Sequence, residues 1–370
     1  MGILRLLLAL SVVVDHCGPI FGLNLISGEL AVHSFYIISG FYMSIILNEK
    51  YVGSNSSYKL FITNRFIRLY PVYWIVLLLT LLGSLAFAFI AKGQHLSILD
   101  GFVSVKPNFW SFFYLILSNI ILFGQDIVMF LGINPENGSL FFTSNFWNNS
   151  PPIYSFLIVP QAWTLAIELT FYLIAPFLLK RKTTTTWTII FLSLSLRIFI
   201  YYHLGFQNDS WAYRFFPTEI AFFLFGHLSY KIYLRLRTST ISKAYPTSVL
   251  IFIVLFTILF QYLPFYRNSY SLFSYNEWAY FLSITLAIPI LFNSFKKMEI
   301  DKTIGELSYP VYISHLLVSR VVSAFPVAAL KSGGVVAIFS VVFSYLLNRF
   351  IGAPIEKYRQ SRVTLAKANS

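Results

Sequence analysis

The sequence contains little charge and a single cysteine. Charged side chains make up 11% of its 370 residues, less than half of the roughly 25% that soluble domains carry. Cys17 alone can form neither an internal disulfide nor a Cys/His zinc motif. Hydrophobic residues reach 57% and aromatic residues 19%. A water-soluble enzyme is therefore excluded, and so is a disordered chain, because so many aromatic side chains cannot remain in water.

Long apolar runs dominate what the sequence does contain. A transmembrane helix needs about 20 consecutive, mainly apolar residues. Ten runs satisfy this requirement: 4–23, 30–47, 69–90, 160–179, 184–203, 215–234, 246–263, 277–295, 308–328 and 334–353. The sequence thus predicts an all-α fold, a polytopic membrane bundle of about ten transmembrane helices. We expect one membrane domain over residues 1–356 and a basic cytoplasmic tail over 357–370.

Basic residues predict how these helices are oriented. The net charge is +13, from 27 Lys and Arg against 14 Asp and Glu. If all ten runs span, most basic residues fall on the side of the N-terminus, including Arg65, Arg68 and the cluster 180–182. The opposite side holds few: Lys92, Lys106, Arg214, Arg267 and Lys331. Because positive charge favours the cytoplasmic side, we expect both termini in the cytoplasm, and the charge excess requires no nucleic-acid partner.

One further apolar segment, 111–131, conflicts with this orientation if it spans. A helix there would prevent Arg65, Arg68 and the cluster 180–182 from all being cytoplasmic. We therefore expect a re-entrant or interfacial helix within a long outer region, 91–159, in which the polar stretch 134–152 is a loop. An excursion of this length is often functional, as a lid or an acceptor-binding rim. The alternative is an adaptor that only covers the bundle.

Two polar residues share one face of the first predicted helix. Arg5 and His16 lie 11 residues apart, which places them about 20° apart around the helix axis and about 16 Å apart along it. Arg5 is then at the cytoplasmic entrance and His16 near the centre of the bilayer. Ionisable groups within a membrane are costly and usually functional. A buried, hydrogen-bonded structural histidine is the alternative for His16.

The fourth predicted helix places a carboxylate at a similar depth. Glu168 lies about 12 Å from the outer end of that helix and shares a face with Thr164 and Tyr172. A histidine and a glutamate at one depth suit a general base and the carboxylate that orients it. His16 and Glu168 are therefore our candidate catalytic pair. A structural ion pair that locks two helices is the alternative.

Arg65 and Arg68 are candidates for binding an anion. Their i, i+3 spacing puts both on one helical face, at the cytoplasmic start of the third predicted helix. Two guanidinium groups on one face suit a phosphate, which they can bind with charge-assisted hydrogen bonds. Contact with anionic lipids and simple setting of topology are the alternatives.

Two more helices carry polar stripes. In the second predicted helix, Glu29, His33 and Tyr36 share a face, and Glu29 and His33 lie close to the outer surface where a polar acceptor would arrive. In the ninth, His315 shares a face with Ser308, Tyr312 and Ser319. A packing histidine is an equal alternative for His315. No internal repeat or inverted pair of broken helices is present, which disfavours a transporter.

These motifs, in this order, resemble the integral-membrane acyltransferase 3 family, whose members O-acylate bacterial surface polysaccharides and other sugars. The resemblance extends from Arg5 to about Glu356. It is carried by five stretches: Arg5 with His16, VHSFYIISGF at 32–41, Arg65 and Arg68 followed by LYPVYW, Trp163 to Glu168 followed by LTFYLIAP, and SYPVYISH ending at His315. The family implies ten helices, in agreement with the apolar runs.

The resemblance also implies a reaction. His16 is expected to remove a proton from a sugar hydroxyl that attacks the thioester of an acyl-CoA, with Glu168 beside it. Arg5, Arg65 and Arg68 are expected to hold the donor. We assign acceptor binding to a further set: His33, Tyr36, Trp163, Tyr172 and His315. No metal and no permanently bound cofactor are expected, and acyl-CoA, most simply acetyl-CoA, serves as donor substrate. A route through an acyl-His16 intermediate stays open.

The expected partners are acyl-CoA, a glycan or lipid-linked glycan, and the lipids of the bacterial inner membrane. A homo-oligomer is left open. The chain lacks the acidic residue common just before the family's first arginine and the esterase-like domain that some members carry, so transfer should finish within the membrane domain or with a separate protein. Two rival functions remain: a transporter or flippase of lipid-linked sugars, and an acyltransferase acting on a lipid or small molecule.

Overall fold

The structure is a computed structural model that describes residues 1–51, 58–90, 98–238, 244–264, 272–325 and 332–368. Lys92, Arg267 and Lys331, which the orientation argument used, lie outside these residues. Helices account for 79% of the structure. The chain divides into two compact units: Met1–Val72, Tyr172–Leu192 and Ile220–Ser370 form unit 1, and Tyr73–Phe171 with Ser193–Glu219 form unit 2.

Unit 1 contains the first helices of the chain and its C-terminal third. The helices wholly within it are α1 (Gly2–Cys17), α2 (Gly28–Ile45) with the π-helical turn η1 (Ile46–Lys50), α11 (Ala244–Leu259) with η5 (Phe260–Tyr262), α12 (Tyr275–Phe295), α13 (Glu299–Ser323), α14 (Gly333–Leu347) with η7 (Asn348–Gly352), and α15 (Ala353–Ala368). Four helices belong partly to each unit: α3 (Tyr58–Ile90), α7 (Trp163–Leu178), α8 (Thr183–Tyr202) and α10 (Phe216–Leu236).

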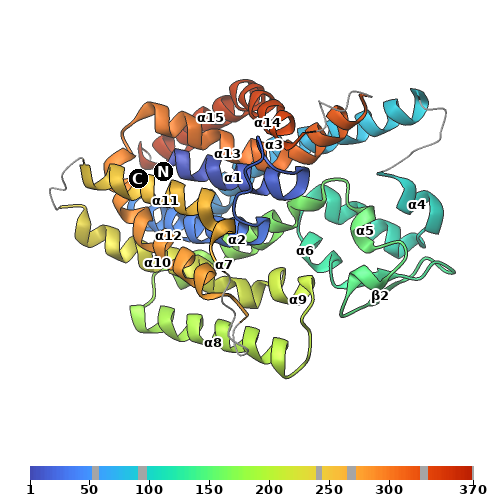
Figure 1. Ribbon diagram of the computed structural model, residues 1–370, viewed down its shortest axis with the longest axis horizontal. Coiled ribbons are helices and arrows are strands. Elements are labelled where there is room, and N and C mark those ends of the chain that lie inside the picture. Colours follow the sequence, from blue (N-terminus) through green and yellow to red (C-terminus); the bar gives the residue numbers. More distant parts are fainter. Residues whose placement is uncertain (52–57, 91–97, 239–243, 265–271, 326–331, 369–370) are drawn as a thin grey trace. The chain divides into compact units, whose positions relative to one another are not determined.

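Helices α1, α13 and α14 pack side by side around an apolar core (Figure 1). Buried small aliphatic residues fill it, among them Ala9 and Val13 of α1, Val311 and Val318 of α13, and Val336 of α14. In a membrane no hydrophobic force drives helices together, because lipid tails are as apolar as the side chains. Helices associate through close van der Waals packing, which small side chains permit. The core therefore holds α1 firmly against the C-terminal helices.

Glycines bring α1 and α13 still closer within their first two turns. A methyl group added at Gly305 would lie 2.8 Å from the Cα of Gly2. Near their other ends, the rings of His16 and His315 are in hydrogen-bonding contact. Residue numbers rise in the same direction in both pairs, so α1 and α13 run parallel.

Unit 2 holds the long region between α3 and α7. Its short elements are α4 (Asp100–Val105), α5 (Phe109–Ile121), α6 (Gln125–Val128), η2 (Phe146–Asn148), η3 (Ile153–Phe156), η4 (Pro160–Ala162) and α9 (Asp209–Tyr213). Strands β1 (Leu131–Ile133) and β2 (Leu140–Phe142) form an antiparallel pair with Ile133 opposite Leu140. We expected the stretch 134–152 to be a loop. That expectation was wrong in part, because β2 and η2 lie within this stretch.

The predicted all-α polytopic bundle is confirmed, and seven helices of the described chain are long and apolar enough to cross a membrane. The three other predicted spans correspond to α1, α10 and α13. Helix α1 has 16 residues and ends at Cys17, because Gly18 adopts a positive φ of 92°; the predicted span to residue 23 is thus too long. Helices α10 and α13 are less apolar on average than the main helices of these seven spans. That these three also span stays a prediction.

Helix α5 is too short to cross. Its 13 residues end at Ile121, where Leu122 takes a positive φ of 63°, and they extend about 20 Å, against about 30 Å for a bilayer core. The parallel direction of α1 and α13 gives a second argument. It requires an even number of crossings between their starts. With α1 and α10 spanning as predicted, α1, α2, α3, α7, α8, α10, α11 and α12 of the described chain supply eight, and a spanning α5 would make nine.

This topology predicts that both flanks of α5 are on one side of the membrane. Ser104 and Glu136 are exposed residues before and after it. With Cys17 replaced by serine, Ser104→Cys and Glu136→Cys should both react with an impermeant maleimide in vesicles of the same orientation. Lys182→Cys, placed beyond α7, should react only in vesicles of the opposite orientation. Labelling of the first two positions from opposite sides would show that α5 spans.

Candidate active site

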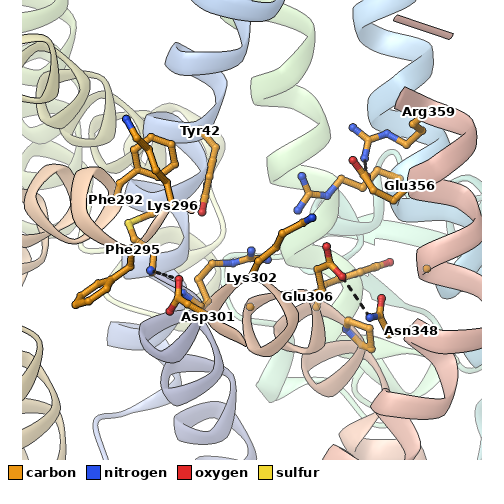
Figure 2. Close-up of a pocket in the computed structure, with 18 of the residues that line it drawn as sticks. Tyr42, Phe292, Phe295, Lys296, Asp301, Lys302, Glu306, Asn348, Glu356 and Arg359 are labelled. Atoms are coloured by element: carbon orange, nitrogen blue, oxygen red, sulfur yellow. Dashed lines mark hydrogen bonds and ion pairs between the residues drawn. The ribbon is translucent and has the colours of Figure 1, made fainter. Parts of the chain in front are cut away.

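A pocket of about 560 Å³ lies in unit 1 at the first turns of α1 and α13 (Figure 2). Basic side chains outnumber acidic ones in its wall. The basic residues are Arg5, Arg68, Lys296, Lys297, Lys302 and Arg359, and the acidic ones are Asp301, Glu306 and Glu356. The volume is in the range of small-molecule sites, about 300–1,000 Å³. An excess of cations in a concave wall favours an anionic ligand.

Four helices and one turn place these charges. Arg5 projects from α1 with its guanidinium 5.8 Å from the centre of the Tyr42 ring of α2. Arg68 comes from α3, and Lys296 and Lys297 follow the end of α12. Figure 2 shows Lys302 and Glu306 of α13 on one side of the pocket and Glu356 and Arg359 of α15 on the other.

Asp301 of α13 caps helix α1 and is thereby withdrawn from the pocket's cations. Its carboxylate accepts hydrogen bonds from the Met1 ammonium at 2.5 Å and from the N–H groups of Gly2 and Ile3 at 2.8 and 3.2 Å. Burial acts to raise the pKa of the Asp301 carboxyl, but these donors lower it below its usual value. The carboxylate thus satisfies the first N–H groups of α1, which have no partner within their own helix.

The two histidines form the second feature of the site. Nδ1 of His16 lies 2.9 Å from Nε2 of His315, and the rings stack with centres 5.1 Å apart. Nδ1 of His315 lies 2.6 Å from the carbonyl oxygen of Tyr312. A carbonyl oxygen only accepts, so Nδ1 of His315 carries the proton and, in the neutral ring, Nε2 accepts one from Nδ1 of His16. His16 then has its lone pair on Nε2.

Exposure differs sharply between these two rings. His315 is fully buried, whereas His16 is exposed in the last turn of α1. The C-terminal end of a helix carries partial negative charge and favours a nearby cation. A positive charge that forms on the His16 ring during a reaction would therefore be favoured at this helix end, with Nδ1 still bonded to His315. Sequence spacing gave no signal for this pair, whose members are 299 positions apart.

The arginines predicted to bind phosphate are separated by the structure. Arg5 and Arg68 line the same pocket. Arg65 does not; it is 1% exposed, lies 6.0 Å from the centre of the Phe61 ring, and its Nε and Nη1 have no hydrogen-bond partner in the described chain. Sequence reasoning missed four cations of the wall, Lys296, Lys297, Lys302 and Arg359. Lys296 and Lys297 form a basic pair beside a helix end, which could have been a signal. Such a pair indicates the cytoplasmic side of a membrane helix equally well.

Two residues assigned to acceptor binding lie inside an aromatic cluster of unit 1. His33 is fully buried, with the ring of Phe222 at 4.1 Å and those of Phe273 and Phe281 at 5.5 and 5.7 Å between centres. Tyr36 stacks on Phe223 at 4.6 Å. We expected His33 close to the outer surface where an acceptor arrives, and the structure shows both side chains packed among aromatic rings. Their part in acceptor binding stays a prediction.

The remaining candidates belong to helix α7. Trp163 is buried in unit 2, 4.8 Å from the Tyr213 ring and 4.2 Å from the guanidinium of Arg214. Glu168 is half-buried in the same unit, and Tyr172, buried, belongs to unit 1. Glu168 and His16 belong to different units, and their pairing stays a prediction.

Comparison with known proteins decides the family. The family model for this acyltransferase domain matches residues 1–349. The chain belongs to the acyltransferase 3 family. A protein of Aquifex aeolicus (strain VF5), described as an uncharacterized protein, is 27% identical over 180 residues, which cover 46% of this chain and 73% of that protein. No solved structure matches the chain.

Family and fold together establish the class of reaction. The protein is a membrane acyltransferase that transfers groups other than aminoacyl groups. The resemblance drawn from the five motifs is thereby confirmed. The matched residues include both histidines of the pair and Arg5 and Arg68 of the pocket.

The close approach of α1 and α13 should be needed for a stable site. Gly305→Val places bulk where even a methyl group would meet the Cα of Gly2, and such overpacking costs about 1–3 kcal/mol. We expect a lower melting temperature in detergent and weaker activity. Gly83→Val is the control, because a Cβ at Gly83 meets nothing within 4 Å. Equal melting temperatures for the two variants would contradict the packing argument.

Proposed function

We propose that the protein transfers an acyl group, most simply acetyl, from acyl-CoA to a hydroxyl of a cell-surface or lipid-linked glycan. One observation carries the proposal: a cation-rich pocket and a histidine held by a second histidine occupy opposite ends of one helix, α1. The first suits the phosphates of the donor and the second suits removal of a proton from the acceptor.

The dimensions of α1 match this division. Arg5 lines the pocket, and His16 lies about 16 Å further along the helix on nearly the same face. An extended pantetheine arm covers such a distance. With the nucleotide phosphates held by Arg5 and Arg68, the thioester of the donor reaches the histidine end of α1. The basic clusters support a cytoplasmic pocket, with both termini on that side of the bacterial inner membrane.

The proposed reaction moves one proton to His16 and back, forms an ester bond and breaks the carbon–sulfur bond of the thioester. Nε2 of His16 accepts the proton of the acceptor hydroxyl as its oxygen attacks the thioester carbonyl carbon. The tetrahedral intermediate collapses, the carbon–sulfur bond breaks, and the new ester forms. The leaving thiolate of CoA then takes the proton from His16, which returns to its starting form. Glu168 is proposed to stabilise the imidazolium from α7.

His315 is proposed as a positioning residue. Its Nδ1 donates to the Tyr312 carbonyl, so its Nε2 faces His16 as an acceptor. That bond holds the His16 ring in the tautomer with the lone pair on Nε2. In the sequence we assigned His315 to acceptor binding; its buried place against His16 favours support of the base instead.

Loss of the base should abolish transfer without unfolding the protein. We expect His16→Ala, in lipid nanodiscs with radiolabelled acetyl-CoA and a panel of lipid-linked glycans, to lose about 10²–10⁴-fold in rate. Asp15→Asn, a change at the exposed neighbouring residue, should transfer normally. Full activity of His16→Ala would reject the base. A wild-type protein that acetylates a lipid or a small molecule but no glycan would reject the proposed acceptor.

The support from His315 can be tested by two replacements. His315→Gln keeps an oxygen that can accept the His16 Nδ1–H bond, whereas His315→Leu has similar bulk and no acceptor. We expect the leucine variant to lose roughly 100-fold in kcat and the glutamine variant to recover most of it, at comparable melting temperatures. Equal losses in both variants would assign His315 to packing alone.

A further inference from the structure

The C-terminal helix α15 begins beyond the residues that match the acyltransferase family. We expected residues 357–370 to be a basic cytoplasmic tail. In the structure, α14, η7 and α15 form one continuous helical stretch, Gly333–Leu365. One of its arginines, Arg359, lines the cation-rich pocket and is 4% exposed.

We propose that Arg359 binds a phosphate of the donor's nucleotide, as a third arginine of the pocket beside Arg5 and Arg68. The inference rests on the proposed use of acyl-CoA and adds a residue that the family match does not reach. It assigns α15 a part in donor recognition. The chemistry required of the ligand is a phosphate group carrying at least one negative charge.

The guanidinium of Arg359 is held in place by two hydrogen bonds, and one of its nitrogens makes none to the described residues. Its Nε donates to the backbone oxygen of Asn64 on α3 at 2.8 Å, and its Nη1 donates to Glu356 one turn earlier on α15. Its Nη2 has no protein partner among the residues described. The side chain as a whole is 4% exposed and lies in the wall of the pocket, so this donor can meet a ligand there. A phosphate oxygen there would complete its hydrogen bonds.

The surrounding charge also calls for an anion. Arg359 is close enough to Arg65 and Arg68 to be repelled by both, and Glu356 is the carboxylate that offsets them. Glu356 is already shared with Gln360, which donates to its other oxygen at 3.0 Å. Three guanidinium groups therefore face one carboxylate. Charges of one sign crowded in a partly buried site are destabilising until a counter-charge arrives, and phosphate matches the geometry of arginine.

A purely structural role would also tie α15 to α3, and Arg362 shows what such a tie involves. Its Nη1 donates to the side-chain oxygen of Asn64 at 2.6 Å, and its Nη2 to Thr63 at 2.9 Å. Arg362 thus contacts the same residue of α3 from the same helix, but it does not line the pocket. It is a matched control for Arg359.

The test compares Arg359→Gln with Arg362→Gln in the full chain in nanodiscs, using two donors. Acetyl-CoA carries the phosphates and S-acetylpantetheine carries none. For Arg359→Gln we expect the KM for acetyl-CoA to rise about 10- to 100-fold, the loss typical of a charged hydrogen bond, with kcat unchanged. Turnover of S-acetylpantetheine should stay the same. Arg362→Gln should match the wild type with both donors.

Several outcomes would overturn the inference. One is an unchanged KM of Arg359→Gln for acetyl-CoA; another is an equal rise with S-acetylpantetheine or in Arg362→Gln. If the wild type used no CoA thioester, the proposed function would fail, and binding of 3′,5′-ADP to wild type and Arg359→Gln would test the phosphate site separately. Equal binding there would refute it. If Arg359→Gln does not fold, Arg359→Lys is the second variant. It keeps the positive charge but cannot form two parallel hydrogen bonds to a phosphate, so its KM for acetyl-CoA should rise less than the 10- to 100-fold expected for glutamine.

Discussion

The parallel contact of α1 with α13 is the constraint on which the rest of the site depends. Gly2 and Gly305 let the two backbones meet at one end, and the rings of His16 and His315 meet at the other. Between them, the small aliphatic core with α14 fixes rotation and register. A shift of α13 by a single turn, about 5.4 Å, would separate the histidines and displace Lys302 from the pocket. The histidine pair and the cation-rich pocket therefore share one scaffold, the contact of α1 with α13.

Ionisable side chains of α1 and α13 lie at the contact between these two helices and in the pocket beside it. The helices that fall below the apolarity or length expected of a span are α1, α10 and α13. Two of them form the site, and each carries one histidine of the pair. Ionisable residues cost free energy in a membrane unless they are paired or face a cavity. The pocket and the histidine contact supply such surroundings for Arg5 and His16 of α1 and for His315 of α13.

Sequence periodicity correctly predicted relations between residues of the same helix. It placed Arg5 and His16 on one face, because the rise and turn of a helix fix that relation without any tertiary information. It could not pair His16 with His315, or bring Lys302 and Arg359 to Arg5, because those relations depend on how distant helices pack. It also extended the first span to residue 23, since composition continues apolar past Gly18, whose positive φ ends the helix. The short length of α5 was likewise hidden, because apolar residues continue beyond the turn at Leu122.

The histidine pair suits the proposed reaction better than a lone histidine would. Before proton transfer, two neutral rings share a neutral hydrogen bond between Nδ1 of His16 and Nε2 of His315. As Nε2 of His16 gains the proton, its ring becomes cationic, and the same Nδ1–H bond becomes charge-assisted and about twice as strong. The interaction therefore stabilises the transition state more than the ground state, which is the condition for it to raise the rate. A carboxylate in place of His315 would bind the neutral ring tightly as well, whereas a neutral imidazole reserves more of its stabilisation for the charged form.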